Sequence, residues 1–291
     1  MFHRKRFRLH LPSRSLILGE RTLVMGVLNI TPDSFSDGGA YLDSEAAIAR
    51  ALELEQDGAD IVDIGGESTR PGATSITSAE ELRRILPVIQ VLSGKLGIPM
   101  SVDTRRADVA EAALAAGAEI LNDVSGLRMD PSLGEVARRA RSPLILMHMR
   151  GTPQTMQRGP FARDVIRDVM SGLRDALARA KRAGLARTQL LLDPGIGFGK
   201  KHEQNFEILA RLPEFARLGC PIVIGTSRKA FLGKALAGSG GPSAPTGERL
   251  LGTAATVTAS ILGGAHIVRV HDVAEMVRVV RVADAISRMQ S

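Results

Sequence analysis

Carboxylate, amide and basic side chains recur at the ends of short apolar runs in this 291-residue sequence. Some could simply cap the helix that follows, as Ser227 or Asp272 could. Carboxylates and amides that end several neighbouring strands would instead meet in one small cavity, where like charges need a ligand, a metal or a cation. The pattern therefore predicts a polar binding site. Its candidates are Asn29, the turn from Gly65 to Arg70, Asp103, Asn122, Asp123, His148, Asp193, Thr226, Ser227, Arg269 and His271.

Basic side chains accompany the last two apolar runs. Lys229 lies in TSRKAF, and Arg269 and His271 lie in RVHD. In a β/α barrel the loops after strands seven and eight are a frequent phosphate-binding place, with a helix N-terminus adding backbone dipoles. We therefore expect an anionic, phosphorylated ligand that His271 helps to bind. His266, at the other end of the same strand, is expected to pack in the core.

Three segments are dense in Gly and Pro, namely TPDSFSDGG, GGESTRPGA and DPGIGFGK. Each alone could be an ordinary turn. Phe35 and Phe198 lie inside two of them, and phenylalanine is a poor turn residue unless it covers a ligand or another loop. We expect one of them to cover a ligand and the other to cover a loop.

The apolar runs number eight, and helical spacing follows each of them. Their near-continuous hydrophobicity, as in LILM and IVIG, is typical of parallel strands covered on both faces. Eight units favour a closed (β/α)8 TIM barrel over an open doubly wound sheet, whose first turn would carry GxGxxG rather than NITPDSFSDGG. The predicted strands are Leu23–Asn29, Asp60–Gly65, Pro99–Asp103, Glu119–Asp123, Pro143–Met149, Gln189–Asp193, Pro221–Gly225 and His266–Val270.

Capping residues and glycines indicate where the helices begin and end. Ser44 and Ser78 are predicted N-caps, and Glu81 completes a capping box with the second. The segment AGSGGPSAPT, residues 237–246, is predicted to be a surface insertion. Helices are predicted to end at Gly58, Gly117, Gly184 and Gly264.

The composition, 44% hydrophobic and 24% charged, is typical of a globular chain with a large core. The net charge of +7 fits a small anionic substrate better than nucleic acid, because only 3% of the residues are aromatic. Neither a signal-peptide pattern nor an apolar run of membrane-spanning length occurs, so we expect a cytoplasmic protein without a membrane partner. The single cysteine, Cys220, precedes a strand and is expected to be a buried structural thiol.

The first residues are strongly basic. Arg4, Arg6 and Arg8 recur at every second position. This alternation favours the exposed face of an N-terminal hairpin over an arm that binds nucleic acid. We expect residues 1–20 to form a basic β-hairpin extension and residues 21–291 to form one (β/α)8 domain.

Seven separated segments resemble, in order and spacing, the signature segments of the dihydropteroate synthase family. They are NITPDSFSDGG, DIGGESTRPGA, SVDTRRADVAEAALAAGAEILNDVSG, MHMRGTPQTMQ, LLDPGIGFGK, IGTSRKAFLG and RVHDV, and they span about Val24 to Val273. The resemblance implies a cytoplasmic (β/α)8 enzyme of folate biosynthesis, usually a homodimer. Such an enzyme joins 6-hydroxymethyl-7,8-dihydropterin diphosphate to 4-aminobenzoate and releases pyrophosphate. Residues 21–291 would then be the catalytic, pterin-binding domain.

The resemblance also implies roles for individual residues. A pterin edge presents an amino group beside a ring N–H, which one carboxylate can accept as a pair, and Asp193 matches the family residue at that edge. Asn29 matches the ligand of Mg²⁺, an ion that takes hard oxygens and often binds together with substrate phosphates. By resemblance the pterin would be bound by Asp103, Asn122, Met147, Asp193, Gly225 and Lys229, and the diphosphate by Thr69, Arg70, Arg269 and His271.

The subsite for 4-aminobenzoate follows from the same resemblance. Phe35 with Asp37 match one loop that closes the site, and Thr69, Arg70 and Pro71 match a second. Many relatives have a polar residue after the lysine of SRK, where this chain has Ala230, so one hydrogen bond to the aminobenzoate carboxylate would be lost unless the helix N-terminus receives it. Aminobenzoate, and sulfonamide drugs in this family, would contact Phe35, Pro71, Phe198 and Lys229.

The implied reaction is a dissociative substitution at the pterin methylene. Magnesium, Arg269 and His271 would stabilise the departing pyrophosphate, while the ring held by Asp103 and Asp193 would stabilise the developing cation. The aniline nitrogen then attacks, and closed loops keep water away. The catalytic candidates are Lys229, Arg269, Asp103 and Asp193.

Two alternatives share part of this pattern. A barrel that transfers a methyl group from methyltetrahydrofolate to a corrinoid protein also binds pterin through carboxylates and asparagine, but it would not need RVHD, the TPDSF loop or the SRK lysine. A paralogue that binds pterin without turnover would be expected to lack Asn29, Lys229 or the loop arginine. All of these features are present in the chain.

Overall fold

The computed structural model describes the chain except for residues 1–3, 32–38, 71, 239–240 and 290–291, and except for the side chains of residues 39–43. Within this part, eight parallel strands form the central sheet, in the order β8-β7-β6-β5-β4-β3-β10-β9. A parallel bridge between Leu192 and Ile222 joins its two outer strands, β8 and β9, so the sheet closes into a barrel. The predicted (β/α)8 fold is confirmed.

The barrel strands agree with the predicted runs to within one or two residues at each end. They are β3 (Leu23–Asn29), β4 (Ile61–Gly65), β5 (Met100–Asp103), β6 (Ile120–Asp123), β7 (Leu144–Met147), β8 (Leu190–Asp193), β9 (Val223–Ile224) and β10 (Ile267–Val270). All are buried or nearly so along their length, because helices cover the outside of the barrel and side chains fill its inside.

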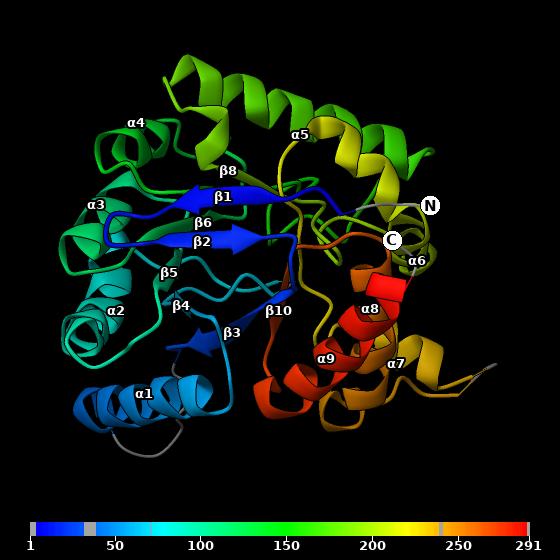
Figure 1. Ribbon diagram of the computed structural model, residues 1–291, viewed down its shortest axis with the longest axis horizontal. Helices are drawn as coiled ribbons and strands as arrows, with labels where there is room; N and C mark the ends of the chain where they lie inside the picture. Colours follow the sequence, from blue (N-terminus) through cyan, green and yellow to red (C-terminus); the bar gives the residue numbers. More distant parts are fainter. Residues whose placement is uncertain (1–3, 32–38, 71, 239–240, 290–291) are drawn as a thin grey trace.

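Helices follow the strands and surround the barrel (Figure 1). The α-helices are α1 (Gly39–Gln56), α2 (Ser78–Ser93), α3 (Ala107–Ala115), α4 (Ser132–Arg139), α5 (Val165–Arg182), α6 (His202–Ala210), α7 (Ala230–Leu236), α8 (Leu250–Leu262) and α9 (Val273–Met289). Short 3-10 helices are η2 (Arg187–Gln189), η3 (Leu212–Leu218) and η4 (Thr246–Glu248). None of the helices in the described part of the chain is long and apolar enough to cross a membrane.

The two predicted N-caps are both wrong. Helix α1 begins at Gly39, so Ser44 lies inside it. Helix α2 begins at Ser78, and its N-cap is Thr77, which has an extended backbone and accepts a hydrogen bond from the Glu80 N–H. A sequence rich in Ser and Thr offers neighbouring residues with equal capping ability, and the backbone angles select between them.

The glycines predicted at helix ends are in place. Gly58, Gly117, Gly184 and Gly264 all have positive φ, between +80° and +115°. At Gly117 a side chain would also collide with Ser93 at the end of α2. Both the positive φ and this close contact therefore require glycine there. These residues turn each helix back toward the next strand.

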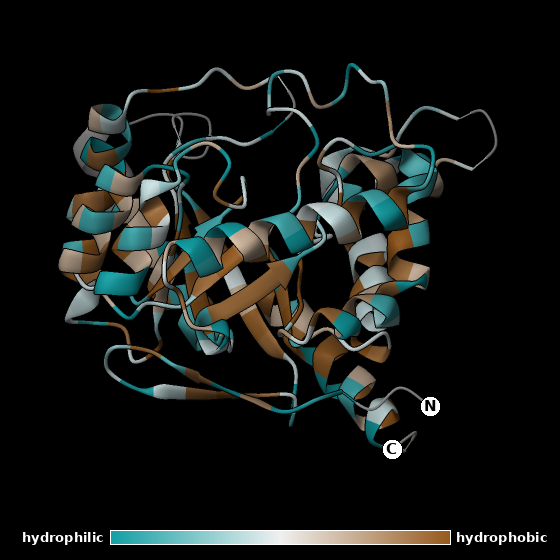
Figure 2. Cartoon of the chain, turned by 90° about the horizontal axis from the view of Figure 1, so that it is seen from above, coloured by the Kyte–Doolittle hydropathy of each residue, from teal (hydrophilic) through white to brown (hydrophobic). Residues whose placement is uncertain are grey.

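A two-stranded antiparallel hairpin lies across one end of the barrel. Its strands are β1 (Phe7–His10) and β2 (Ser15–Leu18), which confirms the predicted extension. Figure 2 shows the hairpin at one end of the apolar strands and the longer loops at the other. Leu9 and Leu18 are fully buried from the hairpin side and pack against the barrel residues that close its floor. Those residues are Leu23, Met25, Ile61, Ile120, Ile145, Leu191, Val223 and Ile267.

Arg4 is not on the exposed face that its alternation with Arg6 and Arg8 predicted. Its side chain is only 9% exposed and pairs with Asp284 of α9 at 3.0 Å. It also donates to the Ala265 carbonyl at 2.9 Å and to the Thr22 hydroxyl. Because these acceptors lie just before strands β3 and β10 and on the last helix, Arg4 fastens the first described residues to the end of the chain.

Cys220 and His266 lie in the core at this same end, as expected. Cys220 is 2% exposed, and burial raises the pKa of its thiol, so it remains protonated and unreactive. His266 accepts from the Ile222 N–H through Nδ1 at 3.0 Å, and its Nε2 lies 2.9 Å from the Lys5 carbonyl. The imidazole therefore joins β9, β10 and the N-terminal segment.

Candidate active site

The predicted polar residues lie in one row across four strands at the carboxyl end of the barrel. In the sheet register Asn29 pairs with Gly65, Gly65 with Asp103, and Asp103 with Asn122. Gly65 leaves an open place between its neighbours, because a Cβ there would lie 3.7 Å from Asn29 Oδ1 and 3.5 Å from the Asp103 Cβ. An amide and a carboxylate therefore face the same space.

A buried aspartate lies beneath this row. Asp63, two residues before Gly65 on β4, is completely buried, and its Oδ2 accepts from Arg269 Nε at 2.6 Å and from Asn122 Nδ2 at 3.1 Å. Within the described chain its Oδ1 has no hydrogen-bond partner. Arg269 also donates to Asp103 Oδ2 at 3.0 Å, so its guanidinium lies between two carboxylates. Asp63 thus orients one residue predicted to bind pterin and another predicted to bind diphosphate.

The charges of this network oppose one another. Burial raises the pKa of Asp103 to about 7, an effect that Arg269 opposes and the nearby Asp63 increases. Burial alone would lower the pKa of Arg269, but Asp63 and Asp103 raise it above its ordinary value. The guanidinium therefore stays charged, while Asp103 can change its protonation state near neutral pH.

Asp193 and Lys229 face each other on the opposite side of the mouth. Asp193 ends β8, and its Oδ1 accepts from the Gly195 N–H at 2.6 Å. Burial raises the pKa of Asp193 and lowers that of Lys229 to about 8, and their mutual attraction opposes both shifts. The Lys229 ammonium donates to the Ile196 carbonyl and lies 4.7 Å from the centre of the Phe198 ring. Phe198 is thus inside the site, with a cation on its face.

Lys200 and His148 lie behind the loop that follows β8, residues 194–199. Lys200 is 4% exposed, and its ammonium lies 2.8 Å from the Gly195 carbonyl, 3.1 Å from the Phe198 carbonyl and 3.1 Å from His148 Nδ1. Burial and the nearby Lys200 hold the pKa of His148 far below its ordinary value, so the imidazole is neutral and can accept. The pattern of polar strand ends indicated His148 but not Lys200.

His271 sits at the rim of the mouth and is neutral. Its Nδ1 lies 3.0 Å from Ser227 Oγ, which also accepts from the His271 N–H at 3.1 Å. Burial, Arg269 and Arg228 lower the pKa of His271 to about 3, and Arg70 contributes to the same shift. His271 therefore does not supply a positive charge before a ligand binds, contrary to its grouping with the cations, but its second nitrogen can donate an N–H.

The other predicted contacts are placed as follows. Met147 is buried against Val124, Met149 and Met156, with Phe198 packed on this apolar cluster. Gly225 lies beside Arg269, whose Cβ is 3.7 Å from where a Gly225 side chain would begin. Thr69 is partly buried and Arg70 is exposed, and Thr69 has no described contact with the other site residues. Phe35, Asp37 and Pro71 lie outside the described residues.

Two of the candidate strand-end residues support the fold instead. Asp123 accepts from the Ser125 and Leu127 N–H groups at 2.7 and 2.6 Å, so it fixes the turn after β6. Thr226 accepts from the Thr256 hydroxyl of α8 at 2.9 Å and is buried. Ala230 is exposed and begins α7, whose N-cap is Lys229.

Protein ligands for a metal are few at this mouth. Among the described residues no group of three or more His, Cys, Asp or Glu side chains could hold a metal ion. Asn29 Oδ1 is a hard oxygen at the edge of the site, in the same row as the Asp103 carboxylate. This donor set fits Mg²⁺ held by one protein group together with phosphate oxygens of a ligand, and does not fit a closed protein site.

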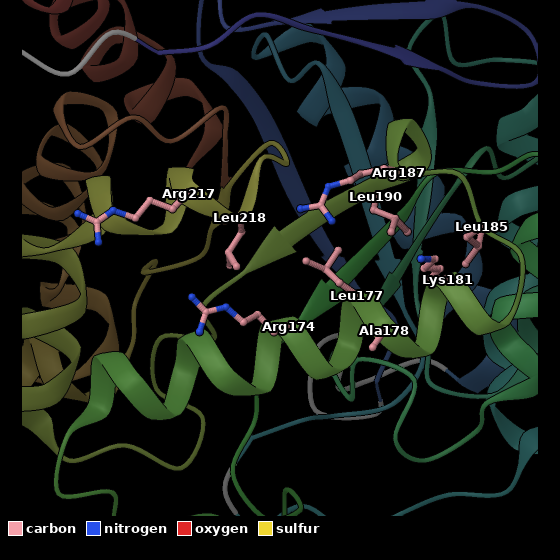
Figure 3. A pocket seen from close by; sticks show the side chains of 9 residues that line it. All are labelled: Arg174, Leu177, Ala178, Lys181, Leu185, Arg187, Leu190, Arg217 and Leu218. Carbon is pink, nitrogen blue, oxygen red and sulfur yellow. The ribbon is translucent and has the colours of Figure 1, made fainter.

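A separate groove of about 690 Å³ lies toward the other end of the barrel (Figure 3). Its side chains come from α5, η2, η3 and the start of β8, and they include Arg174, Arg187, Arg217 and Leu190. Leu190 begins β8, whereas Asp193 ends it, so the groove and the polar mouth lie at opposite ends of this strand. None of the described site residues lines the groove, and it is not the candidate active site.

Comparison with known proteins bears on the whole barrel. The family model described as pterin binding enzyme matches residues 25–271. The chain is 48% identical to the dihydropteroate synthase of Synechocystis sp. over 270 residues. The matched region covers 93% of this chain and 92% of that protein. The Xanthomonas albilineans dihydropteroate synthase with 4-aminobenzoic acid superposes with a TM-score of 0.89 at 42% identity, over 97% and 98% of the two chains. The Yersinia pestis dihydropteroate synthase with a sulfonamide drug has a TM-score of 0.89 at 38% identity, over 96% and 99%.

Proposed function

This chain belongs to the dihydropteroate synthase family of folate-pathway transferases, and we propose that its polar mouth binds the two substrates of that reaction in the arrangement derived below. The observation that carries the proposal is the meeting of Asp103, Asn122, Asp193 and Lys229 at one end of the barrel. The sulfonamide-bound and aminobenzoate-bound relatives support the choice of substrates. The corrinoid methyltransferase alternative is not favoured, because the relatives compared with this chain are synthases.

The pterin ring is proposed to lie between the two carboxylate groups of the mouth. Asp193 uses Oδ1 on the Gly195 N–H, which leaves Oδ2 to accept from the ring edge. Asn122 is held by Asp63, so its amide oxygen is oriented before the ring arrives. Met147 and the chain at Gly225, beside Arg269, would form the walls around the flat ring. A preorganised polar pocket of this kind stabilises positive charge on the ring without rearranging.

The diphosphate is proposed to lie on the side of Arg269 and His271. Arg269 uses Nε and Nη2 on the two aspartates, and its remaining Nη1 is available to a phosphate oxygen. His271 would donate from its second nitrogen, and Arg70, whose charge lowers the pKa of His271, would donate together with Thr69 from the loop after β4. These donors stabilise the negative charge that accumulates on pyrophosphate as its bond to the pterin methylene breaks.

Asn29 is proposed to hold Mg²⁺ through its amide oxygen. When bound, the ion would neutralise charge on the diphosphate and so favour its departure. The supporting observation is Asn29 Oδ1, a hard oxygen that faces the space at Gly65 together with the Asp103 side chain.

The 4-aminobenzoate is proposed to stack near Phe198 and Lys229, with Phe35 and Pro71 supplied by the two loops. Lys229 lies on the face of the Phe198 ring, so a flat anion entering there meets an aromatic wall and a cation at once. The amine nitrogen of 4-aminobenzoate would then attack the pterin methylene on the side opposite the departing pyrophosphate. Sulfonamides would compete for the same place.

We also propose that two copies of the chain associate. Leu251 of α8 is 77% exposed and Leu236 of α7 is 46% exposed, and Leu236 contacts α8 at Gly252. Phe206 of the adjacent α6 is 39% exposed and packs edge-on against Phe231 of α7. A second copy covering these side chains would remove them from water. This is tested by comparing the sedimentation of Leu251→Glu with that of the unaltered protein. If the unaltered protein sediments as a monomer, the proposal is contradicted.

Two further expectations stay proposals. We propose that residues 1–20 act as an extension of the barrel and residues 21–291 as its catalytic domain, supported by the buried leucines of the hairpin. The expected cytoplasmic location is a prediction of the sequence.

The deciding assay mixes the purified protein with 6-hydroxymethyl-7,8-dihydropterin diphosphate, Mg²⁺ and labelled 4-aminobenzoate. Labelled dihydropteroate and pyrophosphate should form in equal amounts, and chelation of the metal should slow their formation. Binding of the pterin diphosphate without either product would contradict the proposal and identify a pterin-binding protein without turnover.

A further inference from the structure

Lys200 is a buried lysine that the mechanism above does not use. It ends the segment DPGIGFGK, follows Gly199 and is 4% exposed. An ammonium in such a place loses the water that would solvate it, and burial lowers the pKa of Lys200 to about 7. A methionine would fill the same space without that cost, so the charge and its hydrogens call for a reason.

The contacts of Lys200 join both ends of a loop to a neighbouring strand. An ammonium has three hydrogens to donate. They face the Gly195 carbonyl at 2.8 Å, the Phe198 carbonyl at 3.1 Å and His148 Nδ1 at 3.1 Å, with the His148 carbonyl at 3.4 Å. Gly195 and Phe198 belong to the loop after β8, and His148 follows β7. One side chain therefore satisfies two backbone carbonyls of this loop and holds them against β7.

The same loop contacts both substrates' predicted subsites from its other side. The Gly195 N–H donates to Asp193, and the Ile196 carbonyl accepts from Lys229. The Phe198 ring lies under the Lys229 ammonium. The loop is thus fixed behind by Lys200 and presents its front to the site.

The backbone of the loop is rich in glycine and needs an anchor to keep one conformation. Gly195, Gly197 and Gly199 all have positive φ, between +68° and +84°. A side chain at Gly195 would collide with the His148 carbonyl, and one at Gly199 would lie 2.5 Å from the Arg150 carbonyl. Glycine permits this close approach but makes the loop conformationally costly to order, so an anchoring side chain is needed.

We propose that Lys200 is a positioning residue for the aminobenzoate subsite. Its ammonium holds residues 194–199 against the end of β7, so that Phe198 and Lys229 are in place before the second substrate binds. Lys200 acts through these residues and does not touch substrate. This inference rests on the proposed function for its kinetic part only, because the hold of Lys200 on the loop can be measured without turnover.

The test compares Lys200→Met with Lys201→Met, a matched change at the exposed lysine one residue on. Three quantities are measured for each: kcat, the KM for 4-aminobenzoate, and the Kd of 6-hydroxymethylpterin from calorimetry without the second substrate. Hydrogen exchange of the peptide covering residues 194–199 is followed in parallel. Lys201→Met should leave all of them unchanged.

In Lys200→Met the KM for 4-aminobenzoate should rise about tenfold or more, as for loss of a residue that orients a binding group. The Kd of 6-hydroxymethylpterin should change less than about threefold, because Asp103, Asn122 and Asp63 lie outside the loop and Asp193, although it accepts from the Gly195 N–H, is itself positioned by β8. Exchange in residues 194–199 should become at least about tenfold faster, while the barrel strands keep their protection. If Lys200→Met does not fold, Lys200→Gln, which keeps two N–H donors at shorter reach, should give the same pattern at smaller size.

Three results would overturn the inference. Unchanged exchange in residues 194–199 would show that Lys200 does not hold the loop. Faster exchange with an unaltered KM for 4-aminobenzoate would leave Lys200 a purely structural residue, and an equal loss of affinity for both ligands would indicate general damage to the mouth. An unaltered protein that makes no dihydropteroate would reject the proposed function instead, with the exchange measurement still deciding the role of Lys200.

Discussion

The two ends of the same eight strands have opposite chemistry. At the amino end the barrel is sealed by leucines of the hairpin and by one layer of aliphatic side chains. At the carboxyl end Asp63, Asp103, Asn122 and Asp193 are buried with Arg269 and Lys229, and one carboxylate oxygen has no described partner. The first arrangement lowers the free energy of the fold, whereas the second raises it unless a ligand is bound.

Strand β4 shows the contrast within a few residues. Asp60, just before its start, accepts from the Val24 N–H and pairs with Arg21, a side chain that is 57% exposed. Asp63, near its other end, is fully buried and pairs with Arg269. The first aspartate is partly exposed and serves the backbone, and the second is fully buried and serves the site. Position along the strand, more than residue type, decides what a carboxylate does in this fold.

The largest effect is expected for Lys229→Ala at the polar end. Loss of the ammonium opposite Asp193 and on the Phe198 ring should lower the rate of dihydropteroate formation by about 10²–10³-fold. The variant should still fold, because Asp193, whose pKa burial already raises, can take up a proton when the ammonium opposite it is lost. Rates near normal would remove Lys229 from the site.

At the apolar end, Leu18→Ala should reduce the free energy of unfolding by about 2–5 kcal/mol, since it opens a cavity beneath a fully buried side chain. The value of kcat at a temperature where the variant is folded should not change. Denaturant unfolding and steady-state kinetics measure the two quantities. A loss of kcat without loss of stability would mean that the two ends are not independent.

Asp63→Asn and Asp60→Asn form a matched pair on β4. The first should lower kcat/KM by about 10–100-fold, because Arg269 and Asn122 lose the carboxylate that orients them. The second should leave kcat/KM unaltered and cost at most about 1 kcal/mol of stability, since Arg21 is 57% exposed and the asparagine oxygen can still accept from the Val24 N–H. Equal effects of the two substitutions on kcat/KM would refute the contrast drawn above.

The pH dependence is the smallest effect. Asp103 has a pKa of about 7 without ligand, above its ordinary 3.8, so acid protonates the carboxyl that the pterin requires. Affinity for 6-hydroxymethylpterin should therefore fall about tenfold per unit as pH drops below 7. The folded state also binds more protons than the unfolded state between pH 3.8 and about 7, so the contribution of Asp103 to stability declines as pH rises through that window.

Calorimetry between pH 5 and 8 checks the affinity, with Asp103→Asn as the control whose profile should lose this titration. A flat profile for the unaltered protein would show that another group controls binding.

The fold could be predicted because the strands are continuous apolar runs and the sequence repeats one unit. The predicted starts at Pro99, Pro143 and Pro221 are one or two residues early, and those at Asp60, Glu119, Gln189 and His266 are one residue early, so the exact first residue of a strand could not be predicted from the apolar run. The row Asn29, Asp103 and Asn122 could be predicted as well, since the ends of parallel strands converge.

Buried charges inside the elements were harder to find. Asp63 did carry a signal, as a carboxylate within the run IVDIG must have a partner, but its partner Arg269 is 206 residues away. Lys200 carried none, because a lysine after glycine is equally compatible with an exposed turn. Arg4 followed the period of an exposed strand face, yet Asp284 from the last helix made burial favourable. The burial of Asp63 and that of Arg4 each depended on a partner distant in sequence.

The fastening of Arg4 to Asp284 and the pairing of β3 with β10 have a consequence for biosynthesis. Strand β3 is made early but receives its second neighbour only when residues 267–270 have been synthesised. Until then its edge presents unpaired backbone groups, which are a template for pairing with another chain. The nascent chain must therefore keep an aggregation-prone edge shielded for most of its synthesis, and shortening it before β10 would leave that edge permanently open.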